Sequence, residues 1–442
     1  MGDVDLARSV AFDVIHRVAV DGTYANLALP KALREHRLKR RDAAFATELT
    51  YGTLRAQGVL DAVIADCATR PLADMDPAVL TALRLGAYQL LYTRVEPHAA
   101  VDSSVKLVIA AGNDYAKGFT NGILRKISRT EPETWLKKLE PATELAAIAF
   151  RHAHPEWIAR SFEQVLGREE LAAALAADSE RPAVHLVARP GEISAEELAL
   201  MVEGSGGKYS PYAVYLPSGD PGRIDAVRDG LAAVQDEGSQ LVARAVAEVE
   251  LDGPDGGRWL DLCAGPGGKA ALMGSLARID GAIVDAVELQ PHRAQLIQQT
   301  VKDLPVRVHT VDGRNPGLEP GFDRVLVDAP CSGLGALRRR PEARWRKQET
   351  DISDLTTLQY QLLESAINLI RPGGIVVYST CSPDLRETRG IINKALENLP
   401  VTELDATPLV PNMTDTGPHK SVQMWPHRHG TDAMFFAVLK KH

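Results

Sequence analysis

The sequence predicts a multidomain chain of three folded parts: an all-α domain over residues 1–135, a small α/β domain over 136–234, and a larger doubly wound α/β domain over 235–442. Two observations support this division. Apolar residues recur at helical spacing through the first third of the chain, and short β-branched runs alternate with helical segments through its second half. A length of 442 residues is enough for a separate core in each part.

Helical periodicity dominates residues 1–135. Between Val4 and Val20, apolar side chains recur every three or four positions. The same pattern returns in four further segments, 42–54, 59–67, 77–92 and 101–110. We expect separate helices whose breaks fall at Pro and Gly residues, because these residues favour turns.

A different pattern follows in residues 136–234. Pro155 stands where it can open a helix, since proline is well tolerated in a first helical turn. Residues 183–188 form a short apolar run that is typical of a strand. Ser194 and Glu197 then have the spacing of a capping box at the start of another helix. Together these signals predict a small α/β domain.

Strands and helices alternate from residue 235 onward. Five apolar, mostly β-branched runs mark the strands, at 258–262, 282–288, 306–311, 324–327 and 375–379. Helical segments separate them. This order predicts a parallel, doubly wound sheet, in which ligands bind at the carboxyl ends of the strands.

The net charge of −8 argues against bulk, non-specific binding of nucleic acid. The charge is unevenly spread. Residues 1–130 hold 17 Lys and Arg against 14 Asp and Glu, so the remainder of the chain is strongly acidic. Basic runs are local, at 34–41 and 338–347. A solvated surface is one interpretation of such a run, and a local nucleic-acid contact is the other.

Four cysteines at unrelated positions do not form a disulfide framework, and no Cys-x-x-Cys pair indicates zinc. We therefore expect no metal, and free thiols fit a reducing cytoplasm. The start of the sequence, Met1 to Asp5, lacks the basic and apolar regions of a signal peptide. No apolar run is long enough to cross a bilayer, so we expect no membrane partner.

A glycine-rich turn, Leu260 to Lys269, follows the first strand of the predicted sheet and opens a helix. Its glycines let the backbone approach a ligand closely, and the helix start offers free N–H groups. Pro266 interrupts the dinucleotide pattern, and no Ser or Thr follows Lys269 as a Walker loop requires. Glu288 and Asp312 end the next two strands, where carboxylates suit a ribose diol and an adenine amino group. The alternative is an ordinary strand–helix turn with solvated acids.

Two further polar turns, after the last two predicted strands, each contain a cysteine. Cys331 lies in the turn that begins at Asp328, and Cys381 follows the strand at 375–379. Activated thiolates occur in polar turns beside ligands, so these positions predict covalent chemistry on a substrate. The alternative is a buried small hydrophobic residue, which we prefer for Cys67 in its apolar helix.

Several short motifs then point to one family. They are Gln235 to Gln240, Leu260 to Lys269, Asp328 to Gly333, Ser379 to Ser382 and Gly430 to Asp432. With them the chain resembles the S-adenosylmethionine-dependent RNA cytosine-5 methyltransferases. The N-terminal part contains Arg41-Asp42, Tyr51-Gly52, Asn121 to Arg125 and His154 to Trp157, and it resembles the RsmB/Sun/Fmu branch. That branch carries a NusB-like domain and modifies small-subunit ribosomal RNA.

The resemblance implies a role for each part of the chain. Residues 1–135 would be a NusB-like RNA-binding domain, 136–234 a linker or RNA-binding domain, and 235–442 a Rossmann-like methyltransferase domain. Cys381 would be the nucleophile, Cys331 an assistant in elimination, and Asp328 a hydrogen-bonding partner of the cytosine near N3. The residues implied to hold S-adenosyl-L-methionine are Cys263, Ala264, Gly265, Pro266, Gly267, Gly268, Lys269, Glu288, Arg293, Asp312 and Asp328.

The physical reason for a cysteine nucleophile lies in the base. C5 of cytosine is too weak a nucleophile to take a methyl group directly, and a thiolate that adds to C6 makes C5 enamine-like. The base must also leave any stack, so single-stranded or loop RNA is the expected partner, with no DNA. Segment 338–347 follows the Cys331 turn, and its arginines with Trp345 suit an RNA strand at the site; a solvated loop is the rival interpretation.

We therefore expect a monomeric, cytoplasmic enzyme that forms 5-methylcytosine in small-subunit (16S) ribosomal RNA through a covalent Cys–C6 adduct. The alternatives are a transfer RNA cytosine-5 methyltransferase and a non-catalytic RNA-binding assembly factor. A small-molecule methyltransferase is weaker, since it needs neither paired cysteines nor the N-terminal domains. The sequence departs from the family pattern at 383–388, which has no Asn, and at Ala264-Gly265, where two alanines are common.

Overall fold

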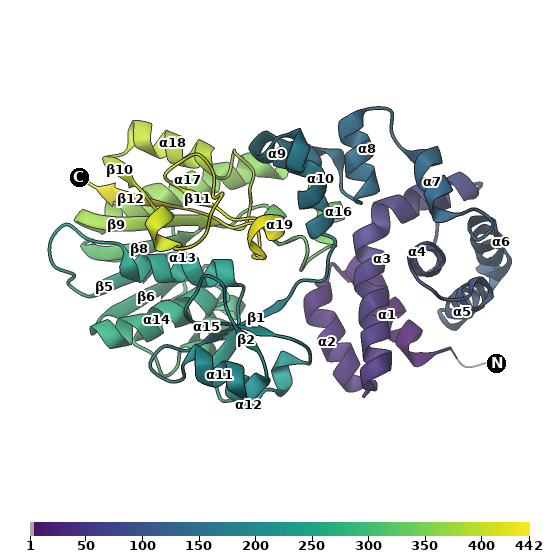
Figure 1. The fold of residues 1–442 in the computed structure, drawn as a ribbon, viewed down its shortest axis with the longest axis horizontal. Helices are drawn as coiled ribbons and strands as arrows, with labels where there is room; N and C mark the ends of the chain where they lie inside the picture. The colour runs from purple at the N-terminus through teal and green to yellow at the C-terminus, as the bar shows by residue number, and fades with distance from the viewer. Residues whose placement is uncertain (1–3) are drawn as a thin grey trace. The chain divides into compact units, whose positions relative to one another are not determined.

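A computed structural model describes residues 4–442 of the chain (Figure 1). Residues 1–3, where the expectation about a signal peptide partly falls, lie outside the described residues. The chain forms two compact units. The helical unit comprises residues 4–180 together with Leu337–Gln348, and the sheet unit comprises Arg181–Ala336 and Glu349–His442. A segment from late in the sequence is thus part of the early unit.

The helical unit is built around α4, which packs against α1, α3, α5 and α6 (Figure 1). Asp76 caps the start of α4 and Pro77 occupies its first turn, both favoured positions. Gly86 in α4 is needed for close packing, because a Cβ there would lie 2.6 Å from the Ser104 hydroxyl. The helices are α1 Leu6–Asp21, α2 Ala25–Glu35, α3 Arg40–Cys67, α4 Pro77–Tyr92, α5 Pro97–Ala110, α6 Lys117–Ile127, α7 Pro132–Leu139, α8 Glu144–Arg151, α9 Glu156–Leu166, α10 Arg168–Ala177 and the short α16 Ala343–Arg346.

One expectation about these helices needs correction. The break expected between residues 54 and 59 does not occur, because α3 runs unbroken through Gly58. Glycine is present there for space, since a Cβ at Gly58 would lie 2.4 Å from the ring of Trp345. Helices α7–α10 are part of the helical unit. The three-domain boundaries remain a proposal.

A small antiparallel sheet begins the sheet unit, with strand order β2-β3-β1-β4. Helix α11 starts at the capping box of Ser194 and Glu197, and it packs over this sheet. The elements are β1 Val184–Ala188, α11 Ala195–Val202, β2 Ser205–Gly206, β3 Ala213–Leu216, α12 Asp225–Arg228 and β4 Ala232–Val234.

A larger sheet follows in the order β10-β12-β9-β8-β5-β6-β7, with β11 paired to β12 (Figure 1). The five expected strands are present and parallel. The complete sheet is mixed, because β12, which was not among the expected strands, is antiparallel to β9 and to β10. Strand β11 and the short helix α19, rather than a long crossover helix, lead into β12, so it enters the sheet in the opposite direction. The strands are β5 Arg258–Asp261, β6 Ile283–Val287, β7 Val306–His309, β8 Phe322–Asp328, β9 Ile370–Thr380, β10 Val401–Leu404, β11 Val422–Gln423 and β12 Phe435–Lys441.

Helices cover both faces of this sheet. Leu326 and neighbours of its face pack on α13 and α14, whereas Val325 and Val327 pack toward α17 and α18. Each fully buried aliphatic side chain stabilises the fold by about 1.5–3 kcal/mol. The helices are α13 Glu237–Glu248, α14 Gly268–Asp280, α15 Pro291–Thr300, α17 Asp351–Leu369, α18 Arg389–Asn398 and α19 Pro426–His429. No helix in residues 4–442 is long and apolar enough to cross a membrane.

The sheet order indicates the carboxyl ends of β5 and β8 as the place to expect a ligand. The chain proceeds outward from β5 to β6 and β7, and then returns to the other side of β5 to form β8 and β9. Connections therefore diverge at the carboxyl ends of β5 and β8, which is where open α/β sheets bind ligands. The glycine-rich turn follows β5, and both cysteine turns follow β8 and β9.

Candidate active site

The fold brings the two cysteine turns together. The sulfur atoms of Cys331 and Cys381 are 3.3 Å apart, and both side chains are partly exposed. A hydrogen bond between the sulfurs lowers the pKa of the Cys381 thiol and raises that of Cys331 well above its usual range. Lys269 also lowers the pKa of Cys381. Of the two thiols, Cys381 is thus the one that ionises more readily, with Cys331 as its hydrogen-bonding neighbour.

Asp328 is held between two partners beside this sulfur pair. Its Oδ1 accepts a 2.8 Å hydrogen bond from the hydroxyl of Ser379, its register neighbour on β9. Its Oδ2 lies 2.8 Å from the ammonium of Lys269. Burial lowers the pKa of Lys269, but Asp328 outweighs this effect and raises it. Lys269 is therefore a fixed cation next to the cysteines, in addition to its place at the start of α14.

A buried carboxylate that the sequence analysis missed anchors the Cys331 turn. Glu387 is fully buried, and its Oε1 accepts hydrogen bonds from the Ser332 N–H at 2.8 Å and from Gln359 at 3.0 Å. Its Oε2 accepts from the Ser332 hydroxyl. Gln359 also donates to the carbonyl of Pro330. Glu387 lies within the segment 383–388 that departs from the family pattern, and nothing in the local sequence distinguishes it from a surface acid.

The glycine-rich turn forms a close-fitting cradle. Gly267 has a φ of +114°, which only glycine adopts readily, and it precedes α14. A Cβ at Gly265 would lie 2.0 Å from the Glu288 carboxylate, so the glycine lets this side chain approach the turn. Arg293 lies 3.3 Å from the same carboxylate and donates to the carbonyl of Gly265. Cys263, Ala264, Pro266 and Gly268 lie in the same turn.

Asp312 follows β7, at the edge of the sheet where the parallel strands have their carboxyl ends. Strand β7 ends at His309, so Asp312 stands in the following loop rather than at the strand end. The guanidinium of Arg314 binds its carboxylate at 2.6 Å and lowers its pKa. Asp312 is thus oriented by a neighbour two residues away.

Asp261 is a second residue that the sequence analysis did not select. It ends β5, is fully buried, and accepts a 3.3 Å hydrogen bond from the Cys263 N–H. Burial and the neighbouring Asp328 raise its pKa to about 7. Among the described residues none donates a hydrogen bond to its Oδ2. A buried acid without a full set of partners, beside an open cradle, fits a cationic ligand.

S-adenosylmethionine has the chemistry that this cradle requires, because it carries a positive sulfonium and an ammonium group. The acids Asp261, Glu288 and Asp328 surround the turn, and the start of α14 provides backbone N–H groups. The residues present therefore fit the cofactor. Within residues 4–442, no group of three or more His, Cys, Asp or Glu could hold a metal ion.

The motifs at 235–240 and 430–432 meet behind the site. The carboxylate of Asp236 accepts from the Gly238 N–H at 2.9 Å and from the Asp432 N–H at 3.1 Å. The next residue, Glu237, accepts from the backbone of Tyr209 and Ser210. These motifs therefore join the small sheet to the large one.

The basic segment 338–347 does not line the site as expected. It belongs to the helical unit, where Arg344 is fully buried and the indole N–H of Trp345 donates to the carbonyl of Leu54 at 2.8 Å. Both interpretations of this segment, as an RNA-stacking strand and as a solvated loop, are wrong for these two residues. The sequence carried no signal for the burial of Arg344 or for the hydrogen bond of Trp345.

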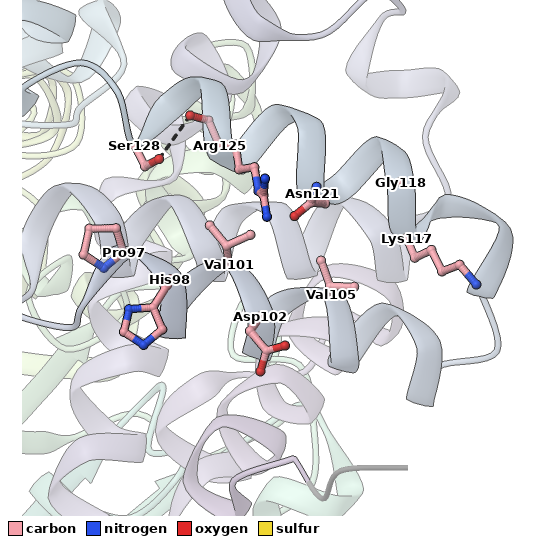
Figure 2. Close-up of a pocket in the computed structure, with 10 residues that line it drawn as sticks. All are labelled: Pro97, His98, Val101, Asp102, Val105, Lys117, Gly118, Asn121, Arg125 and Ser128. Carbon is pink, nitrogen blue, oxygen red and sulfur yellow. Dashed lines mark hydrogen bonds between the residues drawn. The ribbon is translucent and has the colours of Figure 1, made fainter.

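A hollow of about 710 Å³ lies in the helical unit between α5 and α6. Figure 2 shows Asn121 and Arg125 projecting from α6 toward Val101 and Val105 of α5. Lys117 also lines the hollow and pairs with Asp114. No ion pair to the exposed Arg125 guanidinium occurs within the part of the chain that the structure describes. This hollow therefore presents an available cation.

Two family models match the chain. One, described as 16S rRNA methyltransferase RsmB/F, matches residues 248–440, and the other, the NusB family, matches residues 5–129. A methyltransferase of Mycobacterium tuberculosis strain H37Rv is 55% identical over 99% of this chain and 97% of its own. Ribosomal RNA small subunit methyltransferase B of Cronobacter sakazakii is 32% identical over 98% of both chains.

Solved structures share the fold. The crystal structure of PH0851 covers 100% of both chains with a TM-score of 0.85 and 23% identity. NSun6 from Pyrococcus horikoshii, solved with the S-adenosylmethionine analogue SFG, covers 66% of this chain and 99% of its own, with a TM-score of 0.58 and 18% identity. At these identities the likeness concerns the fold alone.

Proposed function

Because the chain belongs to the RsmB/F family and is an S-adenosylmethionine-dependent ribosomal RNA methyltransferase, we propose that it methylates C5 of a cytosine in small-subunit (16S) ribosomal RNA through a covalent cysteine adduct. The family resemblance inferred from the motifs is confirmed. The observation that carries the finer proposal is the sulfur pair, 3.3 Å apart and beside Asp328.

The proposed reaction begins at Cys381. Its lowered pKa favours loss of the thiol proton, and as the sulfur adds to C6 of the cytosine this proton passes to N3 by way of the Asp328 carboxylate. Asp328 is the candidate partner for the N3 edge, and Lys269 and Ser379 hold its carboxylate in place. Addition makes C5 nucleophilic. When bound, S-adenosylmethionine supplies the methyl group that C5 takes.

Release of the product requires removal of the C5 proton and departure of Cys381 from C6. Cys331 is the candidate assistant, because its sulfur is adjacent to the bond that breaks. The S–H of Cys331 is held by the charge on Cys381, and that charge disappears when Cys381 becomes bonded to carbon. The pKa of Cys331, raised first by this hydrogen bond, would then fall, so that Cys331 can lose its S–H proton to solvent and its thiolate can take the C5 proton as Cys381 leaves C6.

The cofactor would be held by the cradle residues Cys263, Ala264, Gly265, Pro266, Gly267, Gly268 and Lys269, with Glu288, Arg293, Asp312 and Asp328. Three acids in this set, Glu288, Asp312 and Asp328, support the assignment, because the cofactor carries positive charge. Asp261 extends the set, because its buried carboxylate faces the same turn.

We further propose that the helical unit contributes RNA affinity through the hollow between α5 and α6. Arg125 has no described ion-pair partner and can neutralise a phosphate, and Asn121 can donate a hydrogen bond beside it. Because the net charge of the chain is −8, we expect RNA phosphates to be contacted by local cations such as Arg125. We expect a monomer to be sufficient, since both proposed surfaces lie within one chain.

Bisulfite sequencing of total RNA from cells with and without the gene tests the proposal. Loss of one protected cytosine in small-subunit ribosomal RNA is expected. Loss in transfer RNA instead would retain the chemistry and overturn the substrate. No lost cytosine in either RNA would overturn the proposed reaction and favour an assembly factor.

A further inference from the structure

The segment Leu337–Gln348, which we name the clasp, leaves the active site and enters the helical unit. It begins six positions after Cys331. The chain then returns to the sheet unit and forms α17, whose Gln359 hydrogen-bonds the Pro330 carbonyl beside Cys331. The clasp is therefore flanked on both sides by residues that build the Cys331 turn.

Arg344 anchors the clasp in a fully buried position. Its guanidinium donates to the carbonyls of Ala153 and Asp178, at 3.2 and 2.5 Å, and to the hydroxyl of Ser179 at 3.2 Å. These groups follow α8 and α10, where a cation satisfies helix-end carbonyls. Ala153 has a φ of +54°, a strained conformation for a residue with a side chain. The strain is next to His154, the first residue of a motif that the catalytic site does not use.

The side chain of Trp345 packs against α3 at Gly58. Its indole N–H donates to the Leu54 carbonyl, and its ring covers Gly58 so closely that a Cβ there would lie 2.4 Å away. A glycine inside a helix is unfavourable relative to alanine. The presence of Gly58 is explained by the ring that lies against it.

Two charged residues near Trp345, Arg346 and Glu342, form hydrogen bonds with the ends of two further helices. The Arg346 guanidinium donates to the carbonyls of Val18, Gly22 and Thr23, at and just beyond the end of α1. The Glu342 carboxylate accepts from the N–H of Ala25, the first residue of α2, at 3.1 Å. Cations at carboxyl ends and an anion at an amino end are the favourable arrangement. The helical unit is thus built to receive this segment.

We propose that the clasp is a positioning element, through which the helical unit orders the Cys331 turn and keeps the Cys331 S–H directed at Cys381. This inference rests on the proposed function for the meaning of that sulfur pair. An undocked clasp would be a loop of twelve free residues between Ala336 and Glu349. Such a loop adds conformational freedom at both flanks of the turn, which docking removes. Arg344 and Trp345 are accordingly positioning residues.

The test uses the full-length chain and the variant Gly58→Ala, which adds one methyl group where the Trp345 ring lies. The matched control is Gly122→Ala in α6, where no atom lies within 4 Å of the added carbon. The readout is the rate at which iodoacetamide alkylates Cys381, followed by peptide mass spectrometry across a pH series. Trypsin cleavage after the arginines of the clasp is an independent measure of whether the clasp has left the helical unit.

Gly58→Ala is expected to expose the clasp to trypsin and to lower Cys381 alkylation at neutral pH about tenfold, as a rise of one pKa unit would. Trp345→Ala should produce the same result, and Trp345→Phe should restore most of the rate. Gly122→Ala should match the wild type. Unchanged alkylation profiles in a variant whose clasp has become cleavable would overturn the proposal.

The control for global unfolding is cofactor affinity, which should stay within about twofold of the wild type if the cradle is intact. If Gly58→Ala fails to fold, Trp345→Phe and Trp345→Ala still separate ring contact from hydrogen bond. Because alkylation needs no RNA, failure of the clasp proposal is distinguishable from failure of the proposed reaction, which the wild-type methylation test decides.

Discussion

The Lys269 ammonium lies 2.8 Å from the Asp328 carboxylate, and this pair joins the glycine-rich turn to the cysteine turns. Lys269 comes from the start of α14 and Asp328 from the end of β8. Lys269 orients Asp328 and lowers the pKa of Cys381, so it links the glycine-rich turn to the proposed nucleophile.

Replacement of either cysteine should have unequal effects. Cys381→Ala should abolish methylation, because no thiolate can add to C6. Cys331→Ala should instead leave protein attached to RNA, since addition proceeds but elimination stalls. Denaturing gels of protein incubated with radiolabelled RNA and cofactor would show the adduct. Cys67→Ala, in α3, is the control and should behave as the wild type; equal losses without an adduct in both site variants would contradict the roles.

Lys269→Ala should slow methylation by about tenfold to a hundredfold at neutral pH, because Cys381 loses a charge that favours its thiolate. The loss should shrink as pH rises, since more Cys381 then ionises without assistance. Rates measured from pH 6 to 9 check this. A loss that stays constant across the series would assign Lys269 to cofactor binding alone.

Asp261 should make cofactor binding depend on pH. Its pKa in the folded chain, raised by burial and Asp328, is about 7, so near neutrality the cofactor-free protein is partly protonated there. A cationic ligand favours the ionised form, so binding should release a proton and strengthen as pH rises through 7. Calorimetry in buffers of different ionisation enthalpy measures the number of protons released on binding. In Asp261→Asn this release should be absent.

The same group predicts how stability changes with pH. Because its folded pKa is raised above the usual 3.8, the folded chain binds this proton more tightly than the unfolded chain does. Its contribution to the free energy of unfolding is fully present below about pH 4 and is lost as pH rises to about 7. Thermal melts of wild type and Asp261→Asn should therefore diverge between these two values.

Glu387→Ala should inactivate the enzyme although both cysteines remain. The substitution leaves the Ser332 N–H without a partner in a buried place, which destabilises the turn by about 1–3 kcal/mol, and it removes one of the two hydrogen bonds that the Gln359 amide donates. Activity and melting temperature should both fall. Glu397→Ala on the exposed face of α18 is the matched control, and its melting temperature should be unchanged.

Arg125→Ala should weaken RNA binding without altering the chemistry at saturating RNA. If Arg125 contacts one phosphate, the slope of log affinity against log salt should fall by about 1. Arg160→Ala, an exposed arginine of α9, should leave the slope unchanged. Fluorescence anisotropy with labelled RNA across a salt series decides this, and an unaltered slope in Arg125→Ala would remove the hollow from the RNA surface.

Sequence patterns alone identified the family and much of the site. The turn at 260–269 could be recognised because glycines at this spacing, directly after an apolar strand, are typical of a ligand-binding turn. Cys331 and Cys381 could be placed at one edge because parallel strands share their carboxyl ends. The helix break expected at residue 58 failed for a related reason, since a glycine that favours a turn can equally serve a close contact.

Other parts of the site depended on contacts between distant residues. Glu387 binds Ser332 across 55 positions, and Arg344 binds Asp178 across 166. No local pattern distinguishes such a buried acid or arginine from a solvated one, because periodicity records which face is buried but not which partner is met there. The sequence by itself determined which motif follows which strand, where the glycine-rich turn lies, and which two cysteines follow neighbouring strands. Only the tertiary structure decided how closely the two sulfurs approach, what holds the Cys331 turn, and to which unit the basic segment belongs, because each of these is set by the packing of elements far apart in the chain.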